Sequence, residues 1–258
     1  MTPSDQIAGH AANPGDSVVV LFKGGRLPAW HALSQREQDA FSQEHVDLML
    51  SVSRRYGLMH LEGFRLLGPQ DNWQRFWVIE FPSLAGAEAW IQAEMAPPYG
   101  RYGYYEYHLA RRVCQDDFND RTSRPTARKS PDSGSDPHRI PSLRIDSTSL
   151  VVLTFRRWLP GAAELSAEER GQVEQARQFK AIAQRHGLIR LEVFRLMAPQ
   201  ADWHEVGLVE LPSFAAAEAW MEAETSLPYS SLVLLNLHLA RKWAPAYFAQ
   251  WVSAVPSD

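Results

Sequence analysis

The sequence contains a single cysteine, Cys114, so no disulfide can form within the chain. A globular protein without disulfides is typical of a reducing compartment. The first 16 residues have neither an apolar core segment nor a basic start, so no signal peptide is expected. No apolar run reaches the roughly 18 residues that a membrane-spanning helix requires. These absences predict a cytoplasmic protein that does not associate with a membrane.

An excess of basic residues is missing as well. The chain has 26 Lys and Arg residues against 30 Asp and Glu residues, which gives a net charge of -4 and a pI near 6.1. This balance lacks the positive footprint of a nucleic-acid-binding protein, so no nucleic-acid partner is expected. The hydrophobic fraction of 45% is that of a soluble globular protein that can bury a core.

Motifs for metals and nucleotides are also missing. The nine histidines are scattered, with no HxxxH, no CxxC and no His-Glu spacing typical of a metal site. No GxGxxG or Walker-type loop occurs, which disfavours nucleotide binding. The sequence therefore predicts no metal and no cofactor, and it favours a small-molecule ligand as the partner.

What the chain does contain is one segment used twice. Residues 57–112 align with residues 187–242 without a gap, and 26 of the 56 positions are identical. Self-similarity of this kind indicates a repeated structural unit. The two halves of the chain are therefore expected to share one fold.

Each unit shows the same order of elements. Ser34 and Glu37 have the spacing of a capping box that starts a helix, and Gly57 ends it. The other segments of the first unit are expected as strands 17–22, 58–67, 74–81 and 101–113 and as a helix over 84–94. In the second unit, Ser166 with Glu169 starts the first helix. The order β-α-β-β-α-β is the ferredoxin-like arrangement, an α+β fold with four antiparallel strands and both helices on one face.

Composition divides the rest of the chain. Unit 1 spans 17–113 and unit 2 spans 148–243, and the polar segment 114–147 between them has too few apolar residues to order itself, so it is expected to be a flexible linker. Residues 1–16 are expected to form a flexible tail. Residues 244–258 form a C-terminal extension, whose aromatic side chains are expected to dock on the body.

The last strand of each unit shows why the units should pair. In unit 2 one face of this strand is uniformly apolar and should meet the helices: Val233, Leu235, Leu237 and Leu239. The opposite face is mixed: Leu232, Leu234, Asn236 and His238. Because a mixed face is too apolar for open water and too polar for a dry core, we expect the bare sheets of the two units to pack on each other around a cavity.

With the element order, the segments FPSLAGAEAW (81–90) and LPSFAAAEAW (211–220) resemble the dimeric α+β barrel superfamily. Its members include antibiotic-biosynthesis-type monooxygenases, EthD-like and NIPSNAP-like proteins, and chlorite dismutases with two fused units. The resemblance implies an eight-stranded barrel made by the two halves, with a ligand site between sheet and helices or within the sheet cleft. Some relatives bind haem through a helix histidine. The helices at 84–94 and 214–224 contain no histidine, which leaves His45 and His186 as haem candidates.

Residues that could carry chemistry lie on the mixed faces of the strands. The predicted catalytic residues are His108, Glu106, Tyr104 and Glu62. The predicted substrate-binding residues are Tyr102, Phe64, Trp77, Glu80, His238 and Asn236. Histidine beside glutamate in a partly closed cavity suits general acid-base work. The alternative is a structural network in which each buried polar group has a partner.

The difference between the copies places the expected site in unit 1. RYGYYEYH (101–108) stands where unit 2 has SLVLLNLH, so unit 1 is aromatic and acidic where unit 2 is aliphatic. The first hypothesis is a cofactor-independent oxygenase, isomerase or lyase acting on an aromatic or polyketide-like substrate. The alternatives are a non-catalytic ligand-binding module and a haem-binding enzyme of the same fold. The sequence leaves open whether two chains pair into a homodimer.

Overall fold

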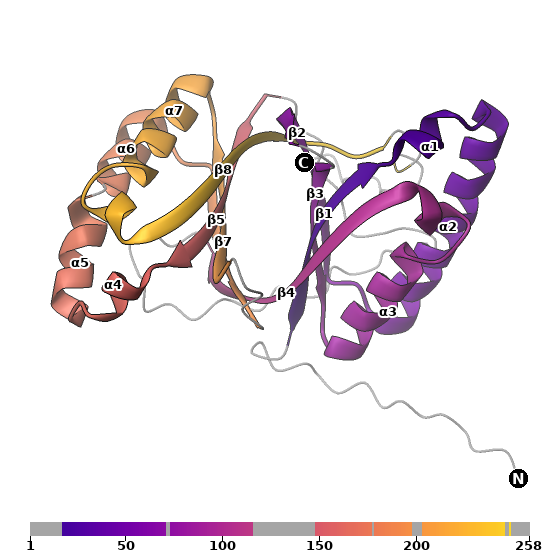
Figure 1. The fold of residues 1–258 in the computed structure, drawn as a ribbon, viewed down its shortest axis with the longest axis horizontal. Helices are drawn as coiled ribbons and strands as arrows, with labels where there is room; N and C mark the ends of the chain where they lie inside the picture. The colour runs from indigo at the N-terminus through magenta and orange to yellow at the C-terminus, as the bar shows by residue number, and fades with distance from the viewer. Residues whose placement is uncertain are drawn as a thin grey trace, which may run out of the picture.

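In the computed structural model, the chain folds into two ferredoxin-like units (Figure 1). The described residues are 17–70, 73–115, 148–176, 178–197, 203–245 and 248. The tail 1–16, the linker beyond Gln115 and most of the C-terminal extension lie outside them.

Unit 1 has the predicted order of elements. It consists of β1 (Val18–Arg26), α1 (Pro28–His31), α2 (Gln35–Tyr56), β2 (His60–Gln70), β3 (Trp73–Phe81), α3 (Leu84–Glu94), the short 3-10 helix η1 (Tyr99–Tyr102) and β4 (Gly103–Gln115). Both halves of the predicted capping box are present, because Ser34 Oγ accepts from the Glu37 amide and the Glu37 carboxylate accepts from the Ser34 amide. Gly57 ends α2 in the left-handed conformation with φ of 67°.

Unit 2 repeats this order with one difference. It consists of β5 (Leu150–Trp158), α4 (Pro160–Ala163), α5 (Ala167–Ala176), α6 (Phe179–His186), β6 (Arg190–Leu196), β7 (Glu205–Leu211), α7 (Phe214–Glu224), η2 (Tyr229–Ser231) and β8 (Val233–Lys242). The prediction of one helix after Ser166 is wrong, since the helix is split into α5 and α6. Gln178 lies at the split with φ of 54°, a left-handed conformation that cannot continue a right-handed helix.

The eight strands form one closed barrel in the order β1-β3-β2-β8-β5-β7-β6-β4. The units join at two antiparallel seams, β2 with β8 and β4 with β6. Closure pairs every strand on both sides and leaves no exposed sheet edge. The prediction that the two halves of the chain close on each other as a dimeric α+β barrel is confirmed.

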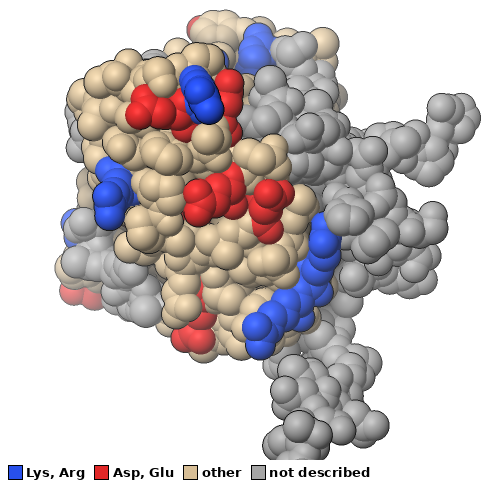
Figure 2. Space-filling view, turned by 90° about the vertical axis from the view of Figure 1, so that its right-hand side faces the viewer, with Lys and Arg blue, Asp and Glu red and all other residues tan. Residues whose placement is uncertain are grey.

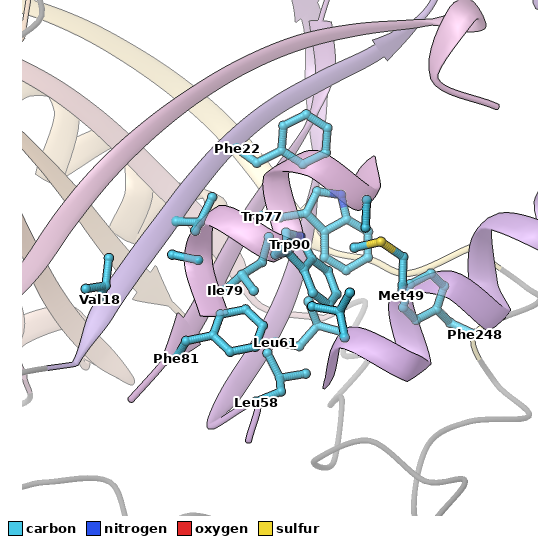
Figure 3. Packing of buried hydrophobic residues seen from close by; sticks show 14 of the residues in the cluster. Val18, Phe22, Met49, Leu58, Leu61, Trp77, Ile79, Phe81, Trp90 and Phe248 are labelled. Carbon is cyan, nitrogen blue, oxygen red and sulfur yellow. The ribbon is translucent and has the colours of Figure 1, made fainter. Parts of the chain in front are cut away.

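Alternation along each strand separates two kinds of core. In β1, Val18, Val20 and Phe22 pack towards α2 and α3 with Trp77 and Trp90 (Figure 3). Val19 and Leu21 point instead into the barrel, whose interior is packed by buried side chains of both units. The barrel interior is thus a shared core, and each unit has its own helix-side core.

A C-terminal segment crosses from unit 2 to unit 1. The Trp243 amide donates to Gly63 O at 2.8 Å, and the Phe248 ring lies 5.4 Å from the Trp77 ring. The predicted docking of C-terminal aromatic residues is therefore confirmed for Phe248, while Tyr247 and Trp251 lie outside the described residues.

Charges of both signs are interspersed on the side of the molecule that unit 1 presents (Figure 2). No helix within the described ranges is long and apolar enough to cross a membrane.

Candidate functional site

Four polar side chains of β1 and β4 meet inside one end of the barrel. We call Lys23, Tyr104, Glu106 and His108 the mouth cluster. The strand register pairs Lys23 with Glu106. Glu106 Oε1 lies 2.7 Å from Lys23 Nζ and 2.8 Å from His108 Nε2, while Oε2 accepts from the Tyr104 hydroxyl at 3.0 Å. Three of the four predicted catalytic residues are therefore in direct contact, and Lys23 joins them.

Glu106 is the centre of this cluster. The hydrogen bond with His108, together with Lys23 and Tyr104 and against the opposing effect of burial, lowers the pKa of Glu106 to about 2. The carboxylate is therefore ionised at neutral pH. Because an ionised carboxylate only accepts, His108 Nε2 carries the proton of this bond. The other ring nitrogen, Nδ1, is buried and has no hydrogen-bond partner among the described residues.

The wall beside the mouth cluster is aromatic. Lys23 Nζ lies 4.2 Å from the centre of the Phe155 ring, and the Trp73 ring lies 4.7 Å from His238. Burial, followed by the charge of Lys23, lowers the pKa of His238 to about 4, so this imidazole is neutral at pH 7. Its Nε2 is buried and also lacks a partner within the described part of the chain.

Exposure decreases from the rim of the barrel inwards. Asn236 on β8 is exposed, and the Glu106 side chain is 31% exposed. Deeper in, His108 and His238 are only 4% and 5% exposed. The polar groups therefore run from solvent towards two buried imidazoles.

The two units contribute differently to this end of the barrel. The position of Lys23 in β1 corresponds to Phe155 in β5, because these residues pair with Glu106 and Asn236 respectively. In the alignment of the two copies, Leu234 is the residue equivalent to Tyr104. Among the positions of the mouth cluster, the histidines His108 and His238 are the same in both copies. The cluster of carboxylate, ammonium and phenol is thus a property of unit 1 alone.

Glu62 and Glu80 lie in a second polar group of the barrel interior, which we call the ion-pair network. Its charged members are Glu62, Glu80, Arg112, Arg190, Glu192, Glu210 and Lys242. Burial by itself would raise the pKa of Glu62, but hydrogen bonds from His60 and Arg190 lower it overall. The structure therefore places Glu62, predicted as catalytic, and Glu80, predicted as substrate-binding, among fixed ion pairs and apart from the mouth cluster.

The three remaining predicted residues lie in three different places. Tyr102 packs in η1 with its ring 5.8 Å from Trp30. Phe64 is fully buried in the barrel core. Trp77 faces the helices and lines a cavity of unit 1.

That cavity, of about 40 Å³, is lined by His45, which the sequence named as a haem candidate, and by Glu94, Tyr99 and Tyr105, which the sequence reasoning missed. His45 Nε2 lies 3.3 Å from Glu94 Oε2, and the His45 ring stacks on Tyr99 at 4.0 Å. Burial and the charge of Glu94 raise the pKa of Tyr105 to about 12, against the opposing effect of Arg26. The sequence did contain a signal for Tyr105. This residue alternates with Tyr104, Glu106 and His108 along the tyrosine-rich strand, so it lies on the opposite face of that strand.

The second helix histidine lies elsewhere. His186 ends α6, is half-buried, and lines an open groove of about 360 Å³ between α6 and α7. Within the described residues, no three His, Cys, Asp or Glu side chains are grouped so that they could hold a metal ion.

Comparison with known proteins gives a result only at the level of structure. No protein-family model matches the sequence, and no curated protein matches it. A double-mutant chlorite dismutase from Candidatus Nitrospira defluvii has a TM-score of 0.65 at 11% identity, covering 92% of this chain and 96% of that one. The enzyme from the same organism in complex with imidazole has a TM-score of 0.63 at 10% identity, covering 88% and 91%.

A candidate chlorite dismutase has a TM-score of 0.58 at 13% identity, covering 92% of this chain and all of the other. At these identities the likeness shows the fold. The chain has the dimeric α+β barrel fold of chlorite dismutases along most of its length, and chlorite dismutases are among the members named in the sequence analysis.

Proposed function

We propose that the chain is a small-molecule enzyme that uses acid-base chemistry at the mouth cluster. The observation that carries the proposal is the His108–Glu106 pair, in which Nε2 is bonded to an ionised carboxylate and Nδ1 has no partner among the described residues. A carboxylate that fixes one imidazole nitrogen sets the tautomer and stabilises the imidazolium that forms when the other nitrogen takes a proton. His108 is therefore the base, and Glu106 orients it.

The cluster supports a defined proton transfer. His108 Nδ1 accepts a proton from a carbon or oxygen acid of the substrate, and the electron pair that is left remains on the substrate as an enolate or phenolate. The Lys23 ammonium provides positive charge in the same space, where low polarity strengthens its effect on the developing anion. The Tyr104 hydroxyl donates its one proton to Glu106 at 3.0 Å, so it holds the carboxylate that orients His108.

The surroundings favour an aromatic or polyketide-like substrate. His108 Nδ1 is buried, and the His108 ring lies 6.5 Å from the Phe155 ring, which is itself in contact with the rings of Trp73 and Trp203. Deprotonation next to a carbonyl or on a phenol is the common first step of cofactor-independent oxygenases, isomerases and lyases. The non-catalytic alternative is a protein that binds such a compound at the same place without converting it.

Deuterium exchange tests this chemistry before the substrate is known. Aromatic 1,3-diketones and phenolic ketones are incubated with the protein in D2O, and loss of the acidic C–H signal is followed by NMR. We expect catalysed exchange that falls by about 100-fold or more in His108→Gln, the usual scale of a general base. The matched control is the exposed His31→Gln. Equal exchange in both variants would overturn the assignment, and saturable binding without exchange would identify the binding module.

A haem-binding enzyme is the second candidate function, and the structural likeness to chlorite dismutases favours it over a reaction without a cofactor. Within the described residues, the spaces between sheet and helices do not fit haem, whereas the open groove of about 360 Å³ that His186 lines lies between α6 and α7. In unit 1 the space between sheet and helices is about 40 Å³, far below the roughly 300 Å³ or more of small-molecule pockets, and His45 is held by Glu94 and Tyr99. In unit 2 Phe179 stacks on Trp220 at 4.1 Å in the corresponding space.

An absorption spectrum decides between the two candidates. The protein is titrated with hemin, and His45→Ala and His186→Ala are compared with wild type. A saturable Soret band that one of these variants abolishes would establish the haem function and displace the acid-base proposal. The packing of both units predicts no specific band.

A further inference from the structure

The cavity of unit 1 is separate from the mouth cluster, because it lies on the helix side of the sheet. Phe22, Trp77 and Trp90 form its walls, and Pro245 and Phe248 close it from the end of unit 2. Figure 3 shows Phe248 beside Met49, in the same group of side chains as Trp77 and Trp90. The cavity is thus built by unit 1 and closed by the C-terminal extension that follows unit 2.

The present volume is too small for an organic ligand. One buried water needs about 10 to 15 Å³ of such space, so a cavity of about 40 Å³ holds a few waters. The Phe248 ring lies next to it, 5.4 Å from Trp77 and tilted by 34°. If this side chain leaves, the cavity gains a slot of the size of one aromatic ring, bounded by Trp77.

The polar groups around the cavity favour an oxygen-rich anion. The lining contains two arginines, Arg26 and Arg75, and one carboxylate, Glu94, which His45 faces at 3.3 Å. Trp90 Nε1 is a buried donor with no hydrogen-bond partner in the described part of the chain. Among the charged side chains of the lining, two guanidinium groups therefore stand against one carboxylate.

We propose that this cavity is a binding site for a single-ring aromatic carboxylate. The ring replaces Phe248 against Trp77, and the carboxylate faces Arg26, Arg75 and the Trp90 N–H. Phe248 is then the intramolecular occupant that the ligand displaces. This site is independent of the chemistry proposed for the mouth cluster.

Calorimetric titration of the full chain tests the site with three probes of one ring size: benzoate, benzyl alcohol and benzylamine. Wild type is expected to bind benzoate in preference to the neutral and cationic probes. Phe248→Ala is expected to bind benzoate at least about fivefold more tightly, because the competing side chain is gone. The matched control is Phe214→Ala, since Phe214 is 54% exposed on unit 2 and should not affect binding.

Two further variants keep the test decisive if Phe248→Ala does not fold. Arg75→Gln, with Phe248 intact, should abolish the preference for benzoate, while His108→Gln should leave benzoate binding unchanged. Absence of benzoate binding in wild type and Phe248→Ala would overturn the proposal. So would equal binding of all three probes by Phe248→Ala, since a mere hole does not select charge, or loss of benzoate binding in His108→Gln, which would place the ligand in the barrel.

Discussion

Arg190 donates two hydrogen bonds of 2.8 Å to the two carboxylate oxygens of Glu62 across the inside of the barrel. Their strands, β6 and β2, are four positions apart in the ring of eight, so the pair joins opposite walls and also joins the two units. Glu192 and Glu210 lie within 3.7 Å and 3.4 Å of the same guanidinium. Arg190 therefore compensates three buried carboxylates at once.

Removal of this guanidinium should destabilise the fold strongly. Breaking a buried ion pair typically costs about 3 to 5 kcal/mol, because it leaves an uncompensated buried charge. We expect Arg190→Met to lower the free energy of unfolding by about this amount in urea titrations. Arg195→Met, an exposed position on the same strand, is the control and should change it by less than about 0.5 kcal/mol. Similar stabilities of the two variants would show that the network is not what holds the units together.

His238 predicts a dependence of stability on pH. Its folded pKa of about 4 is below the 6.5 of an ordinary histidine, so between these values the unfolded chain binds more protons than the folded one. The stability linked to His238 is fully present above pH 6.5 and is lost as the pH falls towards 4. We expect His238→Gln to reduce this acid loss by on the order of 1 kcal/mol. The exposed His31→Gln should retain it, and parallel pH profiles of His238→Gln and wild type would contradict the prediction.

The crossing of the C-terminal segment depends on Gly63. A Cβ at this position would lie 2.5 Å from the Trp243 carbonyl oxygen and 2.7 Å from the Trp77 ring, whereas a Cβ at Gly68 on the same strand meets nothing within 4 Å. We expect Gly63→Ala to displace Trp243, lower stability by about 1 to 3 kcal/mol and change tryptophan fluorescence. Gly68→Ala should do neither. Equal effects of both substitutions would show that no close approach occurs at Gly63.

Local patterns were sufficient to predict most of the fold. The capping box at Ser34, the alternation in the strands and the helix over 84–94 each depend on neighbouring residues, and the structure contains all three. The closure of the barrel was predicted from the face of the last strand of unit 2 that mixes apolar and polar residues and ends at His238. The break at Gln178 was missed, because a single left-handed residue in a polar helix leaves no gap in the apolar pattern.

The candidate site was only partly predictable. Tyr104, Glu106 and His108 share one strand, so alternation alone placed them on one face. Lys23 joins them through the pairing of β1 with β4, which a sequence read strand by strand does not specify. The ion pair of Glu62 could not be predicted for the same reason, since its partner Arg190 is 128 residues away.

The tautomer of His108 is the most direct measure of the central claim. Nitrogen NMR of the histidine side chains at neutral pH, assigned with His108→Gln, distinguishes the protonated ring nitrogen from the free one. We expect the proton on Nε2, held by Glu106, a free lone pair on Nδ1, and loss of this preference in Glu106→Gln. A proton fixed on Nδ1 of the wild-type protein would contradict the account, because the base would then have no lone pair to offer a substrate.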